Sequence, residues 1–197
     1  FQANKLKNKN GKIKKYKAEQ FDFFNKLFFE NQPIIDIDVL VNGFEKNIIS
    51  PREGDAGYDL VASEATVVFK NNHKISFSDN NLPLQYSGFE KPLYIEYNTK
   101  VQINSKNFIC LLFCRSSISN LPLTLSNGVG VVDPSYRGDI KLRFRVLKDK
   151  FVWNEVYQVG DKIAQAIFIP LSKPSLNLVS SLQETQRSVN GFGSTGK

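Results

Sequence analysis

Beyond Pro33, apolar residues recur at every second position, and this period is the strongest constraint on the fold. The segment 140–147 is the clearest case, because its apolar residues alternate with Lys141, Arg143 and Arg145. A period of two places successive side chains on opposite faces of a β-strand. Further strands are predicted at 35–41, 66–69, 74–77, 93–97, 101–103, 108–114, 129–132, 156–159 and 164–169. Many short strands separated by Gly, Asn, Ser and Pro predict an all-β sandwich or barrel.

Two parts of the chain depart from this strand pattern. Residues 1–30 contain a lysine-rich arm and then a predicted amphipathic helix over 16–30, which carries Phe21, Phe24 and Leu27 on one side. We expect this helix to dock on the body; the alternative is a helix that acts with the arm at a membrane or a partner. Residues 31–197 are expected to form one domain, within which 70–92 is a polar loop or inserted hairpin.

The positive charge is concentrated at the N-terminus. Residues 1–17 contain seven lysines and no acidic residue, so they account for the whole formal charge of +7. The rest of the chain carries no net charge, which argues against nucleic-acid binding by the fold as a whole. We expect the lysine-rich arm to be a solvated tail; the alternative is a weak contact with nucleic acid, an anionic surface or an acidic partner.

Apolar runs and cysteines limit the setting of the protein. The longest apolar run has seven residues, 108–114, whereas a membrane-spanning helix needs roughly 20. Cys110 and Cys114 lie about 13 Å apart on a predicted strand, too far for a disulfide, and His73 is too isolated to complete a zinc site. Free thiols indicate an intracellular, reducing compartment, with cytoplasm, nucleus and a viral setting left open. The chain starts at Phe1 and contains no Met, so we expect it to be processed or cut from a longer one.

Five short segments carry residues suited to phosphate and nucleotide chemistry. They are 55–60 (DAGYDL), 115–119 (RSSIS), 127–138 (NGVGVVDPSYRG), 160–165 (GDKIAQ) and 187–196 (RSVNGFGSTG). Glycines let backbone N–H groups approach a phosphate, and hydroxyls supply further donors. Arg115 suits bidentate phosphate binding, Phe192 suits stacking on a base, and Asp133 suits a general base beside a phosphate. Taken singly, each also has an ordinary interpretation as a solvated arginine, a loose tail or a turn residue.

In this order, the five segments resemble the five motifs of the trimeric dUTPases (deoxyuridine triphosphate nucleotidohydrolases). The resemblance runs from about residue 34 to residue 197, and its third and fifth segments are the most specific. It implies a jelly-roll-like all-β fold and a homotrimer with shared active sites, in which the C-terminal arm 184–197 reaches over a neighbouring subunit's site. It also implies Mg2+-dependent hydrolysis of dUTP to dUMP and pyrophosphate, which keeps uracil out of DNA and supplies dUMP for dTMP synthesis.

The third segment carries the most specific implied roles. Asp133 matches the carboxylate that orients and deprotonates the water attacking the α-phosphorus. Tyr136 matches the ring that lies under the deoxyribose, where a 2′-hydroxyl would clash. Asn127, Gly130 and Val132 match the hairpin that reads uracil through mainly backbone hydrogen bonds.

The other segments match phosphate and metal contacts. Asp59 matches an acid that holds waters of the Mg2+ shell rather than the ion itself. Ser188 and Asn190 replace two glycines of the family's fifth motif, which leaves the closing of the arm in question. The remaining matches are substrate contacts: Arg115, Ser116, Ser117 and Gln165 at the phosphates, Arg187 at the terminal phosphate, Phe192 on the uracil, and Gly193, Ser194 and Thr195 in the arm.

Two alternatives compete with this interpretation. A dCTP deaminase shares the fold, but it needs a catalytic glutamate where Arg143 stands, and it leaves the segment GFGSTG unexplained. A non-catalytic dUTPase-fold trimer would bind a partner through the arm and the insertion. Such a scaffold is expected to lose its catalytic motifs, whereas Asp133, Tyr136 and Gln165 are all present, which favours an enzyme.

Overall fold

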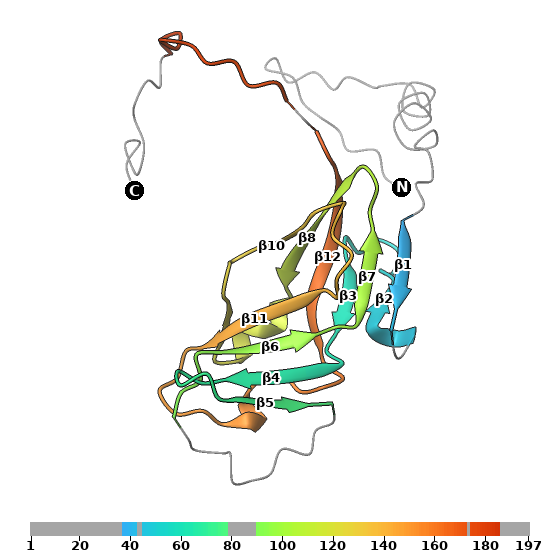
Figure 1. Cartoon of the computed structure of the whole chain (residues 1–197). Coiled ribbons are helices and arrows are strands. Elements are labelled where there is room, and N and C mark those ends of the chain that lie inside the picture. The colour runs from blue at the N-terminus through green and yellow to red at the C-terminus, as the bar shows by residue number, and fades with distance from the viewer. Residues whose placement is uncertain (1–36, 43–44, 79–89, 173, 186–197) are drawn as a thin grey trace, which may run out of the picture.

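The computed structural model describes residues 37–42, 45–78, 90–172 and 174–185 (Figure 1). Almost all regular structure in these ranges is β-strand. The elements in chain order are β1 (Asp38–Val41), η2 (Glu45–Asn47, a 3-10 helix), β2 (Ile48–Ile49), β3 (Tyr58–Val61), β4 (Glu64–Val68), β5 (Lys74–Phe77), β6 (Tyr94–Asn98), β7 (Val101–Asn104), β8 (Phe108–Cys114), η4 (Ser116–Asn120), β9 (Leu123–Leu125), β10 (Gly130–Val132), β11 (Lys141–Val146), η5 (Trp153–Glu155) and β12 (Lys162–Pro170).

Two five-stranded antiparallel sheets form the body of the protein (Figure 1). The first sheet has the strand order β10-β8-β12-β3-β2, and the second has the order β5-β4-β6-β11-β9. Strands β1 and β7 pair separately as a two-stranded ribbon. The chain crosses from the second sheet to the first between β9 and β10, which are both edge strands. The all-β sandwich predicted from the period of two is therefore confirmed.

The alternation along β11 separates the core from the solvent as predicted. Leu142, Phe144 and Val146 are buried, whereas the intervening basic residues are exposed. Phe144 meets Tyr97 and Tyr157 edge-on, with ring centroids 5.7 and 5.6 Å apart. The Tyr97 hydroxyl donates a hydrogen bond of 2.7 Å to the Tyr157 carbonyl. These rings tie the second sheet to the loop before β12.

The strand predicted at 156–159 is wrong. This segment follows η5 and ends in a turn, and Val156 and Tyr157 are buried there without pairing to a strand. The Gln158 side chain donates hydrogen bonds of 2.7 and 3.0 Å to the carbonyls of Trp153 and Val156. A side chain thus satisfies carbonyls that a neighbouring strand would otherwise bind. Conversely, the apolar pattern did not reveal the strands β2, β3 and β9, which have two, four and three residues.

Two further segments with predicted structure are described only in part. Within 35–41, the strand occupies Asp38–Val41, and its Val39 and Leu40 are exposed because β1 pairs outside the two sheets. Within 70–92, β5 forms a hairpin with β4, whereas residues 79–89 lie outside the described ranges. The helix predicted over 16–30 and the lysine-rich arm lie outside them as well.

The cysteines and the membrane prediction agree with the structure. Cys110 and Cys114 are both free thiols, and burial raises the pKa of Cys110 to about 12. His73 is exposed. In the part of the chain that the structure covers, no helix is long and apolar enough to cross a membrane.

Replacing Phe144 by Ala is expected to lower the free energy of unfolding by about 3–5 kcal/mol, because the change removes a fully buried ring and leaves a cavity. Urea unfolding followed by tryptophan fluorescence measures this loss. Arg145→Ala, at the next and exposed position of the same strand, is the matched control. A loss below about 1 kcal/mol in Phe144→Ala, the range of exposed sites, would mean that this ring does not anchor the core.

Candidate functional site

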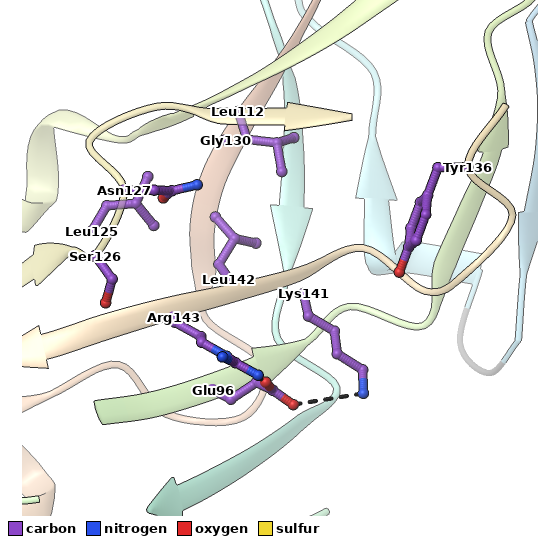
Figure 2. Close-up of a pocket in the computed structure, with 10 residues that line it drawn as sticks. All are labelled: Glu96, Leu112, Leu125, Ser126, Asn127, Gly130, Tyr136, Lys141, Leu142 and Arg143. Carbon is purple, nitrogen blue, oxygen red and sulfur yellow. Dashed lines mark hydrogen bonds and ion pairs between the residues drawn. The ribbon is translucent and has the colours of Figure 1, made fainter. Parts of the chain in front are cut away.

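A pocket of about 400 Å3 lies where the chain crosses between the two sheets (Figure 2). It brings together Asn127, Gly130 and Tyr136, three residues that the sequence predicts to bind one nucleoside. In Figure 2, Asn127 lies at one end of the pocket and Tyr136 at the other. The complete lining consists of Glu96, Leu112, Leu125, Ser126, Asn127, Gly130, Tyr136, Lys141, Leu142 and Arg143.

The turn between β9 and β10 forms one end of this pocket and depends on two glycines. Gly128 has a φ of +70°, a left-handed conformation that glycine adopts without strain. A Cβ on Gly130 would lie 2.9 Å from the Cβ of Leu112, so only glycine lets β10 approach β8 this closely. Because β10 is an edge strand, one side of its backbone offers N–H and C=O groups to a ligand. The Val132 side chain is buried, so Val132 can contribute only its backbone.

The turn that carries Tyr136 forms the other end. The Tyr136 backbone N–H donates to the Asp133 carbonyl at 3.0 Å, and its hydroxyl donates to the Asp139 carbonyl at 3.1 Å. A Cβ on Gly138 would lie 2.4 Å from the Tyr136 hydroxyl oxygen, so the ring lies over the bare backbone of Gly138. The residue is still 45% exposed, which leaves ring surface free for a ligand. Arg137 braces the turn by donating to the Pro134 carbonyl at 2.7 Å.

A charged group borders the pocket on the second sheet. Glu96 on β6 accepts a hydrogen bond of 2.8 Å from the Arg143 Nε and lies 3.6 Å from the Lys141 Nζ. The Arg143 guanidinium also lies 4.6 Å from the centre of the Tyr94 ring. Sequence reasoning missed this group, because the strand register that places Arg143 opposite Glu96 cannot be read from either strand alone.

Asp133 is exposed and lines a different hollow, of about 500 Å3. The other residues of this hollow are Lys106, Asn107, Pro134, Ser135 and Leu171. Asp133 and Tyr136 therefore belong to one turn but open into two hollows of the single chain. The third motif implies that the Asp133 carboxylate and the Tyr136 ring serve one substrate. The two residues are close in sequence, but they do not line the same pocket of the single chain.

A third group of predicted residues lies on the first sheet. Asp59 on β3 is directly opposite Gln165 on β12, and Arg115 follows the end of β8. One Asp59 oxygen lies 2.9 Å from the Arg115 Nε, and the other accepts a 2.9 Å hydrogen bond from the Lys162 Nζ. Ser116 and Ser117 open η4 beside this group, and the Ser117 Oγ lies 3.5 Å from the Tyr157 Oη.

The pKa of Asp59 is lowered by the two cationic side chains around it. Burial alone would raise the pKa of Asp59, whose side chain is 15% exposed, but the Lys162 hydrogen bond and the nearby Arg115 charge outweigh burial and lower the pKa. Two cations around one carboxylate leave a positive surplus beside Gln165. Such a surplus suits an anionic ligand. Lys162 lies inside a motif segment, yet nothing in the sequence alone pairs it with Asp59.

The predicted site residues that the structure describes thus fall into three groups: the Asn127–Tyr136 pocket, the Asp133 hollow and the Asp59 group. Val132, on β10, lines neither hollow. No residue of the Asp59 group lines the Asn127–Tyr136 pocket in the described part of the chain. The five residues of the fifth motif lie outside the described ranges: Arg187, Phe192, Gly193, Ser194 and Thr195. Across those ranges, no cluster of three or more His, Cys, Asp or Glu side chains is placed to hold a metal ion.

Replacing Lys162 by Met is expected to raise the pKa of Asp59, because the change removes the hydrogen bond and one of two nearby positive charges. Carboxyl-carbon NMR titration measures this pKa, and Lys141→Met, which removes a lysine that contacts Glu96 instead, is the control. The lowered pKa in the folded state means that Asp59 stabilises the fold above its unfolded pKa, and that this contribution is lost as the pH falls through the folded value. An unchanged Asp59 pKa in Lys162→Met would contradict the ion pair.

Solved structures with a similar fold are dUTPases. One is a single-residue mutant of the dUTPase of Staphylococcus bacteriophage 80alpha with dUpNHpp, at a TM-score of 0.57 and 18% identity over 82% of this chain and 99% of that one. Another is the dUTPase from phage phi11 of Staphylococcus aureus, at a TM-score of 0.52 and 17% identity over 77% of this chain and 100% of that one. At these identities the likeness establishes the fold, a jelly-roll-like β-sandwich of the dUTPase type.

Sequence relatives point the same way. A deoxyuridine 5'-triphosphate nucleotidohydrolase of Desulfitobacterium hafniense is 41% identical over 87 residues, which are 43% of this chain and 55% of that protein. The chain thus spans about half the length of that relative. A nucleotidohydrolase of the same name from Clostridium kluyveri is 29% identical over 81% of this chain and 99% of its own length. The dUTPase family model matches residues 88–196, which is more than half of the sequence. The chain belongs to the dUTPase family.

Proposed function

We propose that the protein hydrolyses dUTP to dUMP and pyrophosphate with Mg2+, in active sites that three copies of the chain share. The observation that carries this proposal is the Asn127–Tyr136 pocket. It joins an edge of free backbone groups on β10 to a half-exposed tyrosine ring. A pyrimidine edge needs fixed donors and acceptors, and a sugar needs a flat surface, so the two ends of the pocket suit the two halves of a nucleoside.

Selection of the base and the sugar follows from this geometry. Backbone groups of β10 have fixed donor and acceptor directions, so cytosine, whose edge reverses the pattern of uracil, would leave polar groups unpaired. Tyr136 would lie under the deoxyribose, where a ribose 2′-hydroxyl would clash with the ring. Leu112, Leu125 and Leu142 supply an apolar floor.

Asp133 is proposed as the general base. Its carboxylate would take a proton from a water molecule as the water oxygen bonds to the α-phosphorus. The bond between that phosphorus and the bridging oxygen breaks, and pyrophosphate leaves with the bonding electrons. The exposure of Asp133 in the single chain supports access of water and substrate to this carboxylate.

The position of the residues proposed to bind the phosphates supports the sharing of active sites between copies of the chain. Arg115, Lys162 and Gln165 suit a triphosphate, but they do not line the pocket of their own chain. We infer that this group serves the nucleoside pocket of another copy in a homotrimer. A second observation favours such an assembly: Figure 1 shows that the segment after β12 leaves the two sheets, and its Leu176 and Leu178 are exposed. Apolar side chains on an extended segment are stabilised when a neighbouring copy covers them.

The donor groups present are compatible with Mg2+ that arrives with the nucleotide. Mg2+ keeps several waters and binds largely through substrate phosphates, so it does not need a cage of protein carboxylates. When bound, the ion would reduce the charge on the phosphates. Asp59 would accept hydrogen bonds from waters around it, since a carboxylate has about four lone-pair sites and its two cationic partners do not fill them.

Pyrophosphate release from dUTP, dCTP, UTP and dTTP tests the proposed function. We expect release from dUTP alone, its loss when EDTA removes Mg2+, and its return when Mg2+ is added. Asp133→Asn is expected to lower kcat by roughly a hundredfold to ten-thousandfold, because it removes the general base. Asp149→Asn, at another exposed aspartate in a loop, is the matched control and is expected to keep full activity.

Two outcomes would redirect the interpretation. Ammonia released from dCTP would indicate a deaminase of the same fold. A well-folded trimer that turns over none of the four nucleotides would indicate a non-catalytic member of the family, and the arm and the insertion would then be the surfaces to study.

A further inference from the structure

Asp139 lies three residues after Tyr136, and its carboxylate is engaged on several sides. It accepts a 2.9 Å hydrogen bond from the Gln102 Nε2 and a 3.1 Å hydrogen bond from the Asn98 Nδ2. The Lys100 Nζ lies 4.0 Å away, and the Asp139 side chain is 19% exposed. The Gln102 hydrogen bond is the main reason that the pKa of Asp139 is lowered, against the opposing effect of burial. The ionised form of Asp139 is therefore held by two hydrogen bonds and faces one nearby positive charge.

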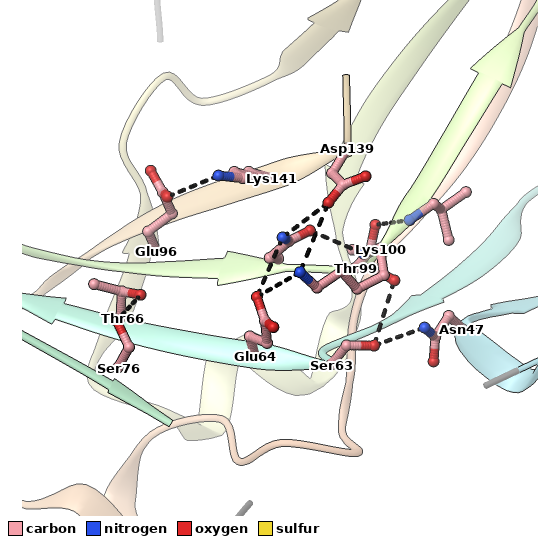
Figure 3. A network of polar contacts seen from close by, with 12 residues as sticks. Asn47, Ser63, Glu64, Thr66, Ser76, Glu96, Thr99, Lys100, Asp139 and Lys141 are labelled. Carbon is pink, nitrogen blue, oxygen red and sulfur yellow. Dashed lines mark hydrogen bonds and ion pairs between the residues drawn. The ribbon is translucent and has the colours of Figure 1, made fainter. Parts of the chain in front are cut away.

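All of these partners lie on one continuous part of the chain, the β6–β7 segment (Tyr94–Asn104), which leads from the second sheet into the ribbon with β1. Figure 3 shows Lys100 of this segment beside Asp139. Lys100 adopts a φ of 57° in its turn, and its ammonium also contacts Glu64 at 2.9 Å. Main-chain bonds reinforce the attachment, since the Thr99 N–H donates to the Ile140 carbonyl at 3.1 Å and the Ile140 N–H donates to the Val101 carbonyl at 2.8 Å. The end of the 133–140 turn is thus fixed to the β6–β7 segment by side chain and backbone together.

The same residue also holds the Tyr136 ring. The Asp139 carbonyl accepts the hydrogen bond from the Tyr136 hydroxyl, and the ring lies over Gly138 between them. Fixing the Asp139 backbone therefore also restrains the Tyr136 ring, through the hydrogen bond of its hydroxyl. Arg137 holds the opposite part of the turn through its 2.9 Å hydrogen bond to Asn104 on β7, but it does not contact the Tyr136 hydroxyl.

We propose that Asp139 is a positioning residue, whose carboxylate fixes the Tyr136 ring against the β6–β7 segment and so sets the preference for dUTP over UTP. This inference rests on the proposed function. Asp139 does not line the Asn127–Tyr136 pocket; it acts through the ring. A ring held in place excludes a 2′-hydroxyl by its position, whereas a ring free to shift makes room for one.

Asp139→Asn tests the proposal. The amide oxygen of the new asparagine can still accept one of the two hydrogen bonds from Asn98 and Gln102. Its NH2 group is a donor and cannot accept the other. The change also removes the negative charge near Lys100. We expect KM for dUTP to rise with little change in kcat, because the ring contacts the sugar in the ground state and in the transition state alike. The ratio of kcat/KM for dUTP to that for UTP is expected to fall on the order of tenfold or more, since a displacement of about 1 Å at a site has effects of up to a hundredfold.

Glu64→Gln is the matched control. Glu64 belongs to the same network, and its oxygen lies 2.9 Å from Lys100 and 3.4 Å from Asn98, but it does not contact the Tyr136 turn. A role in folding alone predicts that both variants lose thermal stability and keep the nucleotide preference. The proposal predicts a changed preference in Asp139→Asn only.

Tyr136→Phe extends the test and keeps it decisive if Asp139→Asn folds poorly. The change removes the hydroxyl that donates to Asp139 and keeps the ring, so we expect an intermediate loss of preference for dUTP over UTP. Gln102→Met, which removes one donor to Asp139, is expected to act in the same direction. Asp139→Asn is expected to reduce the preference for dUTP over UTP less in the Tyr136→Phe background than in the wild type. The reason is that the hydrogen bond from the Tyr136 hydroxyl to the Asp139 carbonyl is already absent in that background.

The outcomes separate the two proposals. A wild-type protein that hydrolyses dUTP, together with an unchanged dUTP-to-UTP ratio in Tyr136→Phe and Gln102→Met, would overturn the role of Asp139 and leave the proposed function intact. A folded wild-type protein that hydrolyses no dUTP would overturn the proposed function, and the role of Asp139 with it.

Discussion

The alternation of side chains along β11 is the constraint on which both the core and the candidate site depend. One face of this strand places Phe144 in the aromatic cluster with Tyr97 and Tyr157. The opposite face carries Arg143, which pairs with Glu96 at the border of the Asn127–Tyr136 pocket. The residue that precedes the strand, Ile140, is joined by backbone hydrogen bonds to Thr99 and Val101 of the β6–β7 segment. A shift of β11 by one residue would exchange these faces and would lose the core, the pocket border and the attachment of the Tyr136 turn together.

Two carboxylates with lowered pKa values take different parts in the molecule. Asp59 is outnumbered by its cationic partners Lys162 and Arg115, so the group retains a positive surplus that suits phosphates. Asp139 instead receives mainly neutral amide donors from Gln102 and Asn98, which orient it without creating a charged surface. The first arrangement suits an anionic ligand, and the second suits the fixing of a backbone turn. A lowered carboxylate pKa alone would not distinguish the two, whereas the identity of the partners does.

The sequence predicted the fold class and most of the longer strands because period-two patterns are local. It failed at 156–159, where tertiary packing buries Val156 and Tyr157 and a glutamine side chain takes the place of a neighbouring strand. The motif segments identified Asn127, Gly130 and Tyr136, and the structure brings these three residues to one pocket. The sequence alone could not identify Glu96 as part of the site or pair Lys162 with Asp59. Those contacts depend on the register between strands that are far apart in the chain. Nor did the closeness of Asp133 and Tyr136 in sequence predict that they open into two hollows.

The conformation of Lys100 has a consequence for how this position can vary. A φ of 57° costs a side-chain-bearing residue about 1 kcal/mol or more relative to glycine. Glycine would therefore relieve the backbone of the β6–β7 turn, but it would withdraw the ammonium that lies between Glu64 and Asp139. The residue that is best for the turn and the residue that is best for the network are thus different. Under the proposed role of Asp139, lysine keeps the charge that this carboxylate faces, at the expense of strain in the turn, so the local backbone and the network make opposite demands on this position.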